Sequence, residues 1–271
     1  MHLLFLGTAA AEGYPGIFCE CDNCKEARAL GGRNLRLRSS LLVNDDLLLD
    51  MGPDLVTQSY CYNLRLTLVR TALITHYHSD HFDLANIHYR NKTGTVAVRP
   101  PRLKIFAPVE AIEAAQQQFH DLEEVQIDLQ EVGPFQTWEH GGYRFTSYLA
   151  YHSDSSLLCL FYDIDDGTQR VLYATDTGPF PNATWQALAG KSFDIIILEE
   201  TEGYGRWPRH MNFESFLDHH RRFRQQGMLR PGGRVIAHHL SHAWNPVHDK
   251  VVQILEPHGV TVAYDGLEIT L

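Results

Sequence analysis

The stretch His76-Tyr77-His78-Ser79-Asp80-His81 places four side chains that can bind a metal within six consecutive positions. It follows residues 66–75, which end apolar and β-branched, as a strand does. The four side chains are therefore expected on the loop that leaves a strand end, where rigid scaffolds tend to hold functional groups. Alternation in an extended stretch lets His76 and His78 share one ion, whereas Asp80 and His81, after the turn, suit a second. Imidazole with carboxylate favours Zn, Mn or Fe over Ca or Cu(I).

Three more candidate ligands stand directly after short apolar runs, so each is expected at a strand end: His152, Asp176 and His239. A lone histidine or aspartate at a strand end is usually only solvated. Together with the first motif, however, the three indicate a metal centre assembled from several loops.

A second metal signature lies near the start of the chain, where Cys19, Cys21 and Cys24 put three of the five cysteines into six residues. Closely spaced thiols without a signal peptide favour a metal knuckle over disulfides, and a disulfide would leave one of these three cysteines over. A closed tetrahedral zinc site needs a fourth ligand. The best candidate is His242, three residues after His239.

The spacing H-x-H-x-D-H resembles the signature of the metallo-β-lactamase superfamily of hydrolases, and the resemblance extends over nearly the whole chain, residues 3–271. It implies that His152 completes the first metal site, that Asp176 bridges the two ions, and that His239 is the last ligand of the second. Asp50 matches the strand-end aspartate that braces the histidine loop in that superfamily.

The cysteine motif and the H-x-x-H spacing at residues 239–242 resemble, more narrowly, the phosphoribosyl cyclic phosphodiesterases of bacterial phosphonate (C–P lyase) degradation. That resemblance implies a structural zinc held by the three cysteines and His242, a catalytic role for His210, and a homodimer. Asp80 is counted with His210 among the catalytic residues as well as among the ligands. Residues 88–140 match no substrate motif, so the chemistry is better defined than the substrate.

The expected activity is hydrolysis of a small, anionic, cyclic phosphate ester such as a phosphoribosyl cyclic phosphate. Two divalent ions, Zn or Mn, would activate a water for attack on phosphorus, and His210 would protonate the leaving oxygen. Two alternatives remain at this point. One is an RNA-processing nuclease of the same superfamily, and the other is a non-hydrolytic relative similar to those of pyrroloquinoline quinone biosynthesis.

Composition limits these possibilities. The chain has 271 residues, of which 44% are apolar, and a formal net charge of −10, so it is a poor general binder of nucleic acid. No apolar run is as long as a membrane-spanning helix requires, and the first residues have the pattern of a core strand and not of a signal peptide. Both features predict a cytoplasmic protein.

The pattern of short apolar runs and interspersed helices predicts an α/β (α+β) fold. With the resemblance, this is an αββα four-layer sandwich in one domain over residues 1–271. Strands are expected at residues 3–6, 41–49, 68–75, 103–106, 143–149, 157–163, 170–174, 194–199, 233–237 and 260–264. Helices are expected at residues 109–119, 212–223 and 246–255, with Asn212 and Asn245 as N-caps.

Several other residues are expected to take no part in a metal site. His219, His220 and His248 are expected to be solvated on helices, whereas alternation along the strand turns His238 away from His239. Cys61 and Cys159 are expected to be inert core residues.

Overall fold

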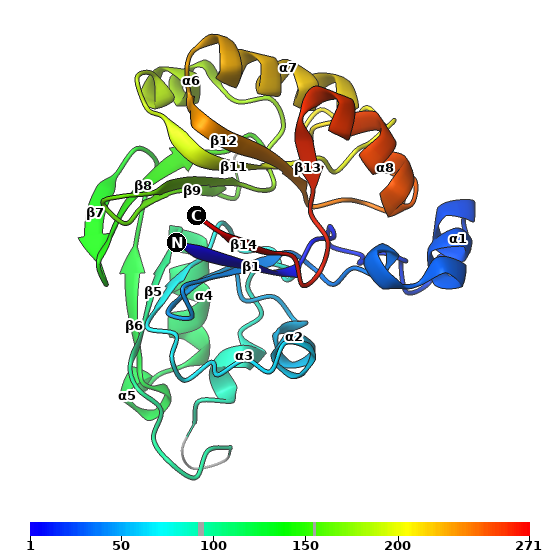
Figure 1. The fold of residues 1–271 in the computed structure, drawn as a ribbon. Coiled ribbons are helices and arrows are strands. Elements are labelled where there is room, and N and C mark those ends of the chain that lie inside the picture. The colour runs from blue at the N-terminus through cyan, green and yellow to red at the C-terminus, as the bar shows by residue number, and fades with distance from the viewer. Residues whose placement is uncertain (92–94, 154–155) are drawn as a thin grey trace.

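The computed structural model describes residues 1–91, 95–153 and 156–271, and it has the four-layer α/β architecture expected from the sequence. Two seven-stranded sheets pack face to face, and helices cover the outer face of each sheet (Figure 1).

The first sheet has the strand order β14-β1-β2-β3-β4-β5-β6. Pairing is antiparallel from β14 to β3 and parallel from β3 to β6. The strands are β1 (His2–Gly7), β2 (Ser40–Val43), β3 (Leu47–Leu49), β4 (Thr71–Leu73), β5 (Leu103–Ala107), β6 (Ile127–Glu131) and β14 (Glu268–Thr270).

The second sheet, of order β13-β12-β11-β10-β9-β8-β7, repeats this plan. Pairing is antiparallel from β7 to β10 and parallel from β10 to β13. Each sheet therefore has a parallel half, and the carboxyl ends of parallel strands are the usual place for a site. The strands are β7 (Thr137–His140), β8 (Tyr143–Leu149), β9 (Leu160–Asp165), β10 (Arg170–Ala174), β11 (Phe193–Glu199), β12 (Leu229–His238) and β13 (Val260–Val262).

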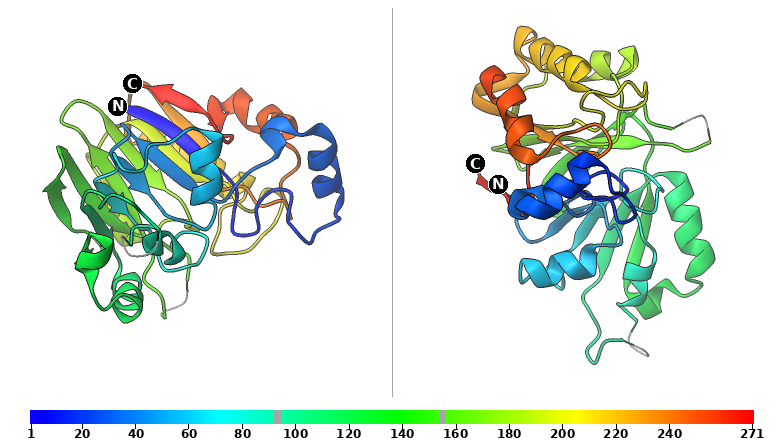
Figure 2. Two further views of the ribbon diagram at one scale, coloured as in Figure 1. Left: turned by 90° about the horizontal axis from the view of Figure 1, so that it is seen from below. Right: turned by 90° about the vertical axis from the view of Figure 1, so that its right-hand side faces the viewer.

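The helices divide between the two outer faces, and one lies to the side (Figures 1 and 2). The first sheet is covered by α2 (Leu55–Cys61), α3 (Ala85–His88), α4 (Val109–Gln118) and α5 (Leu122–Val125). The second is covered by α6 (Asn182–Leu188), α7 (Phe213–Gln225) and α8 (His248–Leu255). Helix α1 (Asp22–Leu30) projects beyond the sandwich together with the cysteine segment. None of the helices in the described ranges is long and apolar enough to cross a bilayer.

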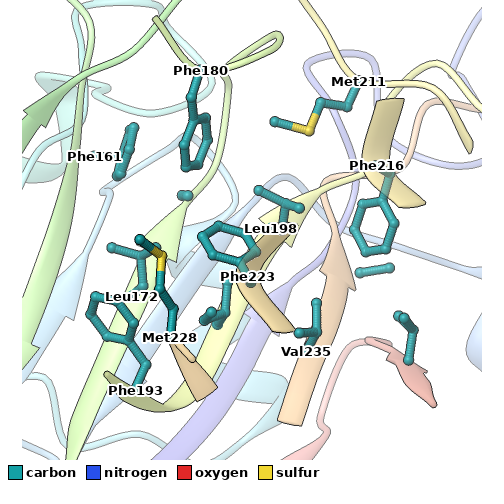
Figure 3. Packing of buried hydrophobic residues seen from close by; sticks show 14 of the residues in the cluster. Phe161, Leu172, Phe180, Phe193, Leu198, Met211, Phe216, Phe223, Met228 and Val235 are labelled. Atoms are coloured by element: carbon teal, nitrogen blue, oxygen red, sulfur yellow. The ribbon is translucent and has the colours of Figure 1, made fainter. Parts of the chain in front are cut away.

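The apolar core forms three layers that match this arrangement. One lies between the sheets and includes Phe5, Tyr162 and Tyr173, all fully buried. Another lies between the second sheet and its helices, where the aromatic rings of Phe161, Phe180, Phe216 and Phe223 gather with Leu198 (Figure 3). The third fills the space between the first sheet and α2–α5. The strands near the site are thus packed on both faces, which holds their ends rigidly.

Helix α7 shows how the sequence sets an element of the outer layer. Asn212 caps it as expected, and Asn212 and Ser215 form a reciprocal capping box, an arrangement that contributes on the order of 1 kcal/mol. Its buried face includes His219 and His220, so the expectation that these histidines are solvated is wrong. His219 accepts a hydrogen bond from the backbone N–H of Phe180 at 3.0 Å, so its ring is satisfied inside the layer.

Other departures have equally local causes. The run 41–49 is a hairpin, because Asn44 and Asp45 take left-handed backbone conformations between β2 and β3. Helix α8 begins at His248, which is buried, while Asn245 donates instead to the carbonyls of Glu200 and Thr201. Cys159 is buried as expected, but Cys61 lies exposed at the end of α2.

Candidate metal centre

The expected catalytic ligands come from four segments, and each segment follows the C-terminal end of a strand. The histidine loop, residues 76–81, follows β4; His152 follows β8; Asp176 follows β10; and His239 follows β12. These four strand ends belong to both sheets, and the structure brings their side chains together in two adjacent groups.

The first group consists of His76, His78 and His152. Nε2 of His76 lies 2.8 Å from Nδ1 of His78, and Nε2 of His152 lies 3.1 Å from the same atom. His76 is fully buried. Its other ring nitrogen, Nδ1, is 2.9 Å from the hydroxyl of Thr75, which leaves Nε2 to face the group.

The second group consists of Asp80, His81, Asp176 and His239, all of them buried. Nε2 of His81 lies 3.0 Å from Oδ2 of Asp80 and 2.6 Å from Oδ2 of Asp176. Nε2 of His239 lies 3.1 Å from Oδ1 of Asp176.

Asp176 lies between the two groups. Its Oδ2 atom is 3.4 Å from Nε2 of His76 as well as 2.6 Å from Nε2 of His81, so this one oxygen reaches ligands of both groups, while Oδ1 approaches His239. A carboxylate in that position is suited to bridge two ions.

The donor atoms fit a divalent metal. Nε2 of His81, Nε2 of His239 and Oδ1 of Asp176 are buried without a hydrogen-bond partner within the described ranges. Ligands about 2.1 Å from a tetrahedral ion lie about 3.4 Å from one another, close to the separations here. Orphaned donors and acceptors converging in this way are costly unless an ion binds them.

Asp50 braces the histidine loop from the end of β3. Its carboxylate accepts hydrogen bonds from the backbone N–H of Thr75 at 2.8 Å and from Nδ1 of His81 at 2.7 Å. Asp50 thereby holds the proton on Nδ1 of His81, so a metal ion in the second group would displace the Nε2 proton and bind there. Burial favours the neutral ring, but the carboxylates of Asp80, Asp176 and Asp50 outweigh it and raise the pKa of His81 well above its usual value.

Three of these residues adopt a left-handed backbone that side chains other than glycine rarely take. The φ angles are 61° at Asp50, 49° at Asp176 and 60° at His239. Asp50 and His239 directly follow β3 and β12, and Asp176 stands two residues after β10, so each turn comes where a strand gives way to a loop of the centre. Such strain persists where the surrounding structure imposes it, and it is concentrated at functional sites.

His210 lies at the edge of the two groups. Its ring centroid is 4.8 Å from that of His152, and its Nδ1 atom is 3.7 Å from Oδ1 of Asp176. Sequence reasoning placed this residue by family resemblance alone, and the structure brings it to the candidate centre.

Glu199, at the end of β11, is a site residue that the sequence analysis missed. It is fully buried, accepts a hydrogen bond from Nδ1 of His210 at 2.8 Å, and also accepts from the backbone N–H of Met211 at 2.8 Å and from Thr201. Thr201 in turn contacts Nδ1 of His239 at 2.9 Å. Glu199 follows the apolar run of β11, the same signal that identified Asp176. It also joins Asp176, His210 and His239 in a further group that could hold an ion.

The cysteine segment and His242 form a separate group at the edge of the fold. Sγ of Cys21 lies 3.8 Å from Nδ1 of His242, and Asn23 donates to the carbonyl of His242 at 3.0 Å. A Cβ on Gly16 would stand 2.4 Å from Nε2 of His242, so only glycine lets the imidazole approach this loop. The sulfurs and the imidazole nitrogen lie within 4.8 Å of one another, close enough to hold a single ion.

His238 lies outside all of these groups, as strand alternation predicts. Its Nε2 atom is 3.1 Å from the carbonyl oxygen of Gly7, and its ring packs against Phe5 and Tyr173 between the sheets. Burial lowers the pKa of His238 to about 3, so the ring is a neutral part of the core.

Two facing mixed sheets, with histidine and aspartate side chains gathered at their strand ends, define the metallo-β-lactamase fold. A family model described as the beta-lactamase superfamily domain matches residues 46–240, well over half of the chain, so this chain belongs to the β-lactamase superfamily, whose members are generally hydrolases. Among curated protein sequences, none matches the chain.

Solved structures with the same fold span nearly all of the chain. A diphosphatase of the PhnP family has a TM-score of 0.77 and 22% identity, with 99% of this chain and 96% of that chain covered. Zn²⁺-bound PqqB from Methylobacterium extorquens has a TM-score of 0.75 and 20% identity over 100% of both chains. The short form of human tRNase Z has a TM-score of 0.69 and 16% identity, with 100% and 99% covered. At these identities the likeness establishes the fold and not the substrate.

Proposed function

We propose that this protein is a metal-dependent phosphodiesterase that hydrolyses a small cyclic phosphate ester, such as a phosphoribosyl cyclic phosphate. The observation that carries the proposal is the position of His210, beside two adjacent ligand groups and anchored by the buried carboxylate of Glu199. An acid placed there can protonate the leaving oxygen of a phosphate ester that lies at these groups.

The first ligand group and the second would each hold one divalent ion, Zn or Mn, with Asp176 shared between them. When bound, such a pair supplies Lewis-acid stabilisation and an activated water. The cysteines and His242 would hold a third, structural zinc. Asp80 belongs to the second group and would be one of the ligands of its ion.

The chain's own residues complete the chemistry. Glu199 fixes Nδ1 of His210, and Nε2 on the other side of the ring makes no hydrogen bond within the described part of the chain. Burial alone would lower the pKa of His210, but the carboxylates of Glu199 and Asp176 outweigh it and raise the pKa to about 9. The imidazolium that results near neutral pH can donate its Nε2 proton to the leaving oxygen.

The acidic character of the chain supports a small substrate over a long nucleic acid. At a net charge of −10, the protein lacks the general electrostatic attraction that RNA-binding enzymes use. In this proposal, the protein therefore shares the fold of tRNase Z but does not act on RNA. The homodimer and the cytoplasmic location implied by the sequence stay predictions, to be tested by light scattering and by fractionation.

The decisive experiment is a hydrolysis assay on protein whose metal content has been counted. Bis(p-nitrophenyl) phosphate and ribose 1,2-cyclic phosphate are the two substrates, each with and without added Mn²⁺. Turnover of both, with about three metals per chain, supports the proposal. Three metals without phosphodiester turnover would overturn it and leave a carbonyl ester or an RNA end as the substrate. A single metal without turnover would favour a non-hydrolytic role.

A further inference from the structure

One group of possible metal ligands has no ion assigned to it by the proposed reaction. It consists of Asp176, Glu199, His210 and His239, and we call it the acid-side group. Asp176 and His239 also belong to the second ligand group, so Glu199 and His210 are the members that distinguish the acid-side group. Their ligand atoms all lie within 4.8 Å of one another, close enough for a single ion to contact them together.

The acid-side group has the spacing of a metal site. Nδ1 of His210 lies 2.8 Å from Oε2 of Glu199 and 3.7 Å from Oδ1 of Asp176. Nε2 of His239 lies 3.1 Å from the same oxygen of Asp176. Ligands of a tetrahedral ion stand about 3.4 Å apart, and the observed separations lie on either side of that value. Oδ1 of Asp176 is buried and accepts no hydrogen bond within the described ranges, so its lone pairs are free for an ion.

The carboxylate of Glu199 is held in place by the fold. Its Oε1 atom accepts a hydrogen bond from the backbone N–H of Met211 at 2.8 Å, and its Oε2 atom accepts one from the hydroxyl of Thr201. The side chain is also fully buried, and a buried carboxylate requires a positive charge beside it. Either protonated His210 or a divalent ion can supply that charge.

An ion and the Nδ1 proton of His210 compete for the same place. Because a carboxylate only accepts hydrogen bonds, Nδ1 of His210 carries a proton where it meets Glu199, and this hydrogen bond orients the ring. A bound ion replaces that proton, which passes to solvent, and the Nδ1 lone pair becomes a ligand. His210 then loses its anchor, and the N–H that remains at Nε2 is a weaker acid than the imidazolium.

We infer that Asp176, Glu199 and His210 form an inhibitory site for one additional Zn²⁺ ion. The inference rests on the proposed function, since it concerns the regulation of the same centre. An imidazole with two carboxylates binds Zn²⁺ more tightly than Mn²⁺, following the general order of divalent metal affinities. Because Asp176 is shared with the proposed catalytic pair, the additional ion binds more weakly than the pair and after it. Excess zinc therefore inhibits the protein at concentrations at which Mn²⁺ does not.

The first test counts bound ions. Zinc-loaded wild type, Glu199→Gln and His210→Ala are dialysed against increasing concentrations of free Zn²⁺, and the bound zinc is measured by metal analysis. Glu202→Gln is the matched control, because it removes the same charge from a side chain that accepts from the backbone N–H of Trp207 and belongs to none of the ligand groups in the described ranges.

At stoichiometric zinc these proteins are expected to hold the same number of ions, because the proposed catalytic ligands are intact in each. In excess zinc, wild type and Glu202→Gln should take up about one ion per chain more than Glu199→Gln and His210→Ala. Circular dichroism verifies that all of the variants are folded. Equal uptake by all of the proteins would overturn the inference.

The second test measures turnover of bis(p-nitrophenyl) phosphate over the same range of free zinc. Wild type and Glu202→Gln should lose about 10-fold or more of their turnover as the additional ion binds, whereas Mn²⁺ at the same concentration should cause no loss. Constant turnover during uptake of the additional ion would refute its inhibitory role. If the wild type hydrolyses no phosphodiester, the proposed function fails and the ion count alone decides. Uptake lost in Glu199→Gln and His210→Ala would still support the metal site, and equal uptake would refute it.

Discussion

The His/Asp centre and the cysteine group are both candidate metal sites, but the protein builds them differently. The centre consists of side chains from strand ends of two packed sheets, and most of its ligands are buried. The cysteines of the other group lie in a loop and at the start of α1, beside the sandwich, and His242 comes from the loop after β12; only Cys24 of the four members is buried.

The surroundings differ as well. Asp50, Thr75, Thr201 and Glu199 hold the histidines of the centre through their second ring nitrogens. The cysteine group depends on a few contacts, such as the hydrogen bond from Asn23 to the carbonyl of His242. These contacts indicate that the fold positions the ligands of the His/Asp centre before any ion binds. In the cysteine group, by contrast, we expect the ion itself to order the ligands.

Removing the shared carboxylate should have the largest effect. Asp176→Ala is expected to lower phosphodiester turnover about a thousandfold or more, because Asp176 contacts ligands of both groups. Metal analysis should show loss from the centre and retention of the zinc that we propose at the cysteine group. A variant that kept both activity and metal content would contradict the shared role.

His210→Ala should come next, because it removes the proposed acid and none of the expected ligands. We expect kcat to fall about 100- to 10,000-fold, with metal content unchanged. A matched Glu199→Gln variant should give a smaller loss in kcat, since the amide can still contact the imidazole but carries no charge. If His210→Ala instead lost metal, the residue would be a ligand of the centre and not its acid.

Asp50→Asn should weaken the centre without removing a ligand. The amide cannot favour the Nδ1–H tautomer of His81 as the carboxylate does, so metal affinity is expected to fall about 10- to 100-fold. Titration with a chromogenic chelator measures this directly. High concentrations of added metal should restore most of the activity, and a failure to do so would place Asp50 in the chemistry itself.

His242→Ala should have the smallest effect on turnover, and it tests most directly whether the cysteine group and the His/Asp centre are independent sites. It is expected to release one zinc per chain and to increase hydrogen exchange in residues 16–24, while the centre keeps its metals. Assays are run on protein shown to be folded by circular dichroism. A large loss of turnover in folded protein would show that the two sites are not independent.

The candidate centre could be predicted from the sequence because its expected ligands are close together or follow clear apolar runs. Four of them fall within residues 76–81, and His152, Asp176 and His239 each follow a recognisable strand. Glu199 also follows an apolar run, but it belongs to no recognisable motif. Its role depends on a contact with His210, 11 positions away in the sequence, and only the structure reveals that contact.

The fold was predicted less completely, and the misses share a physical cause. Strands β6 and β7 lie at sheet edges and are largely polar or exposed, so they show little apolar pattern. The buried histidines of α7 were assigned to solvent because histidine is amphipathic and its environment depends on neighbours distant in sequence.

The placement of β14 has a consequence for how the chain is made. Residues 268–270 complete the first sheet by pairing with residues 2–4 of β1, although the strand before them, β13, belongs to the second sheet. Residues 2–4 therefore lack this neighbour until residues 268–270 have been synthesised. In the second sheet, by contrast, neighbouring strands are consecutive in sequence. We therefore expect the first sheet, during synthesis, to expose an unpaired edge at β1 that chaperones can recognise.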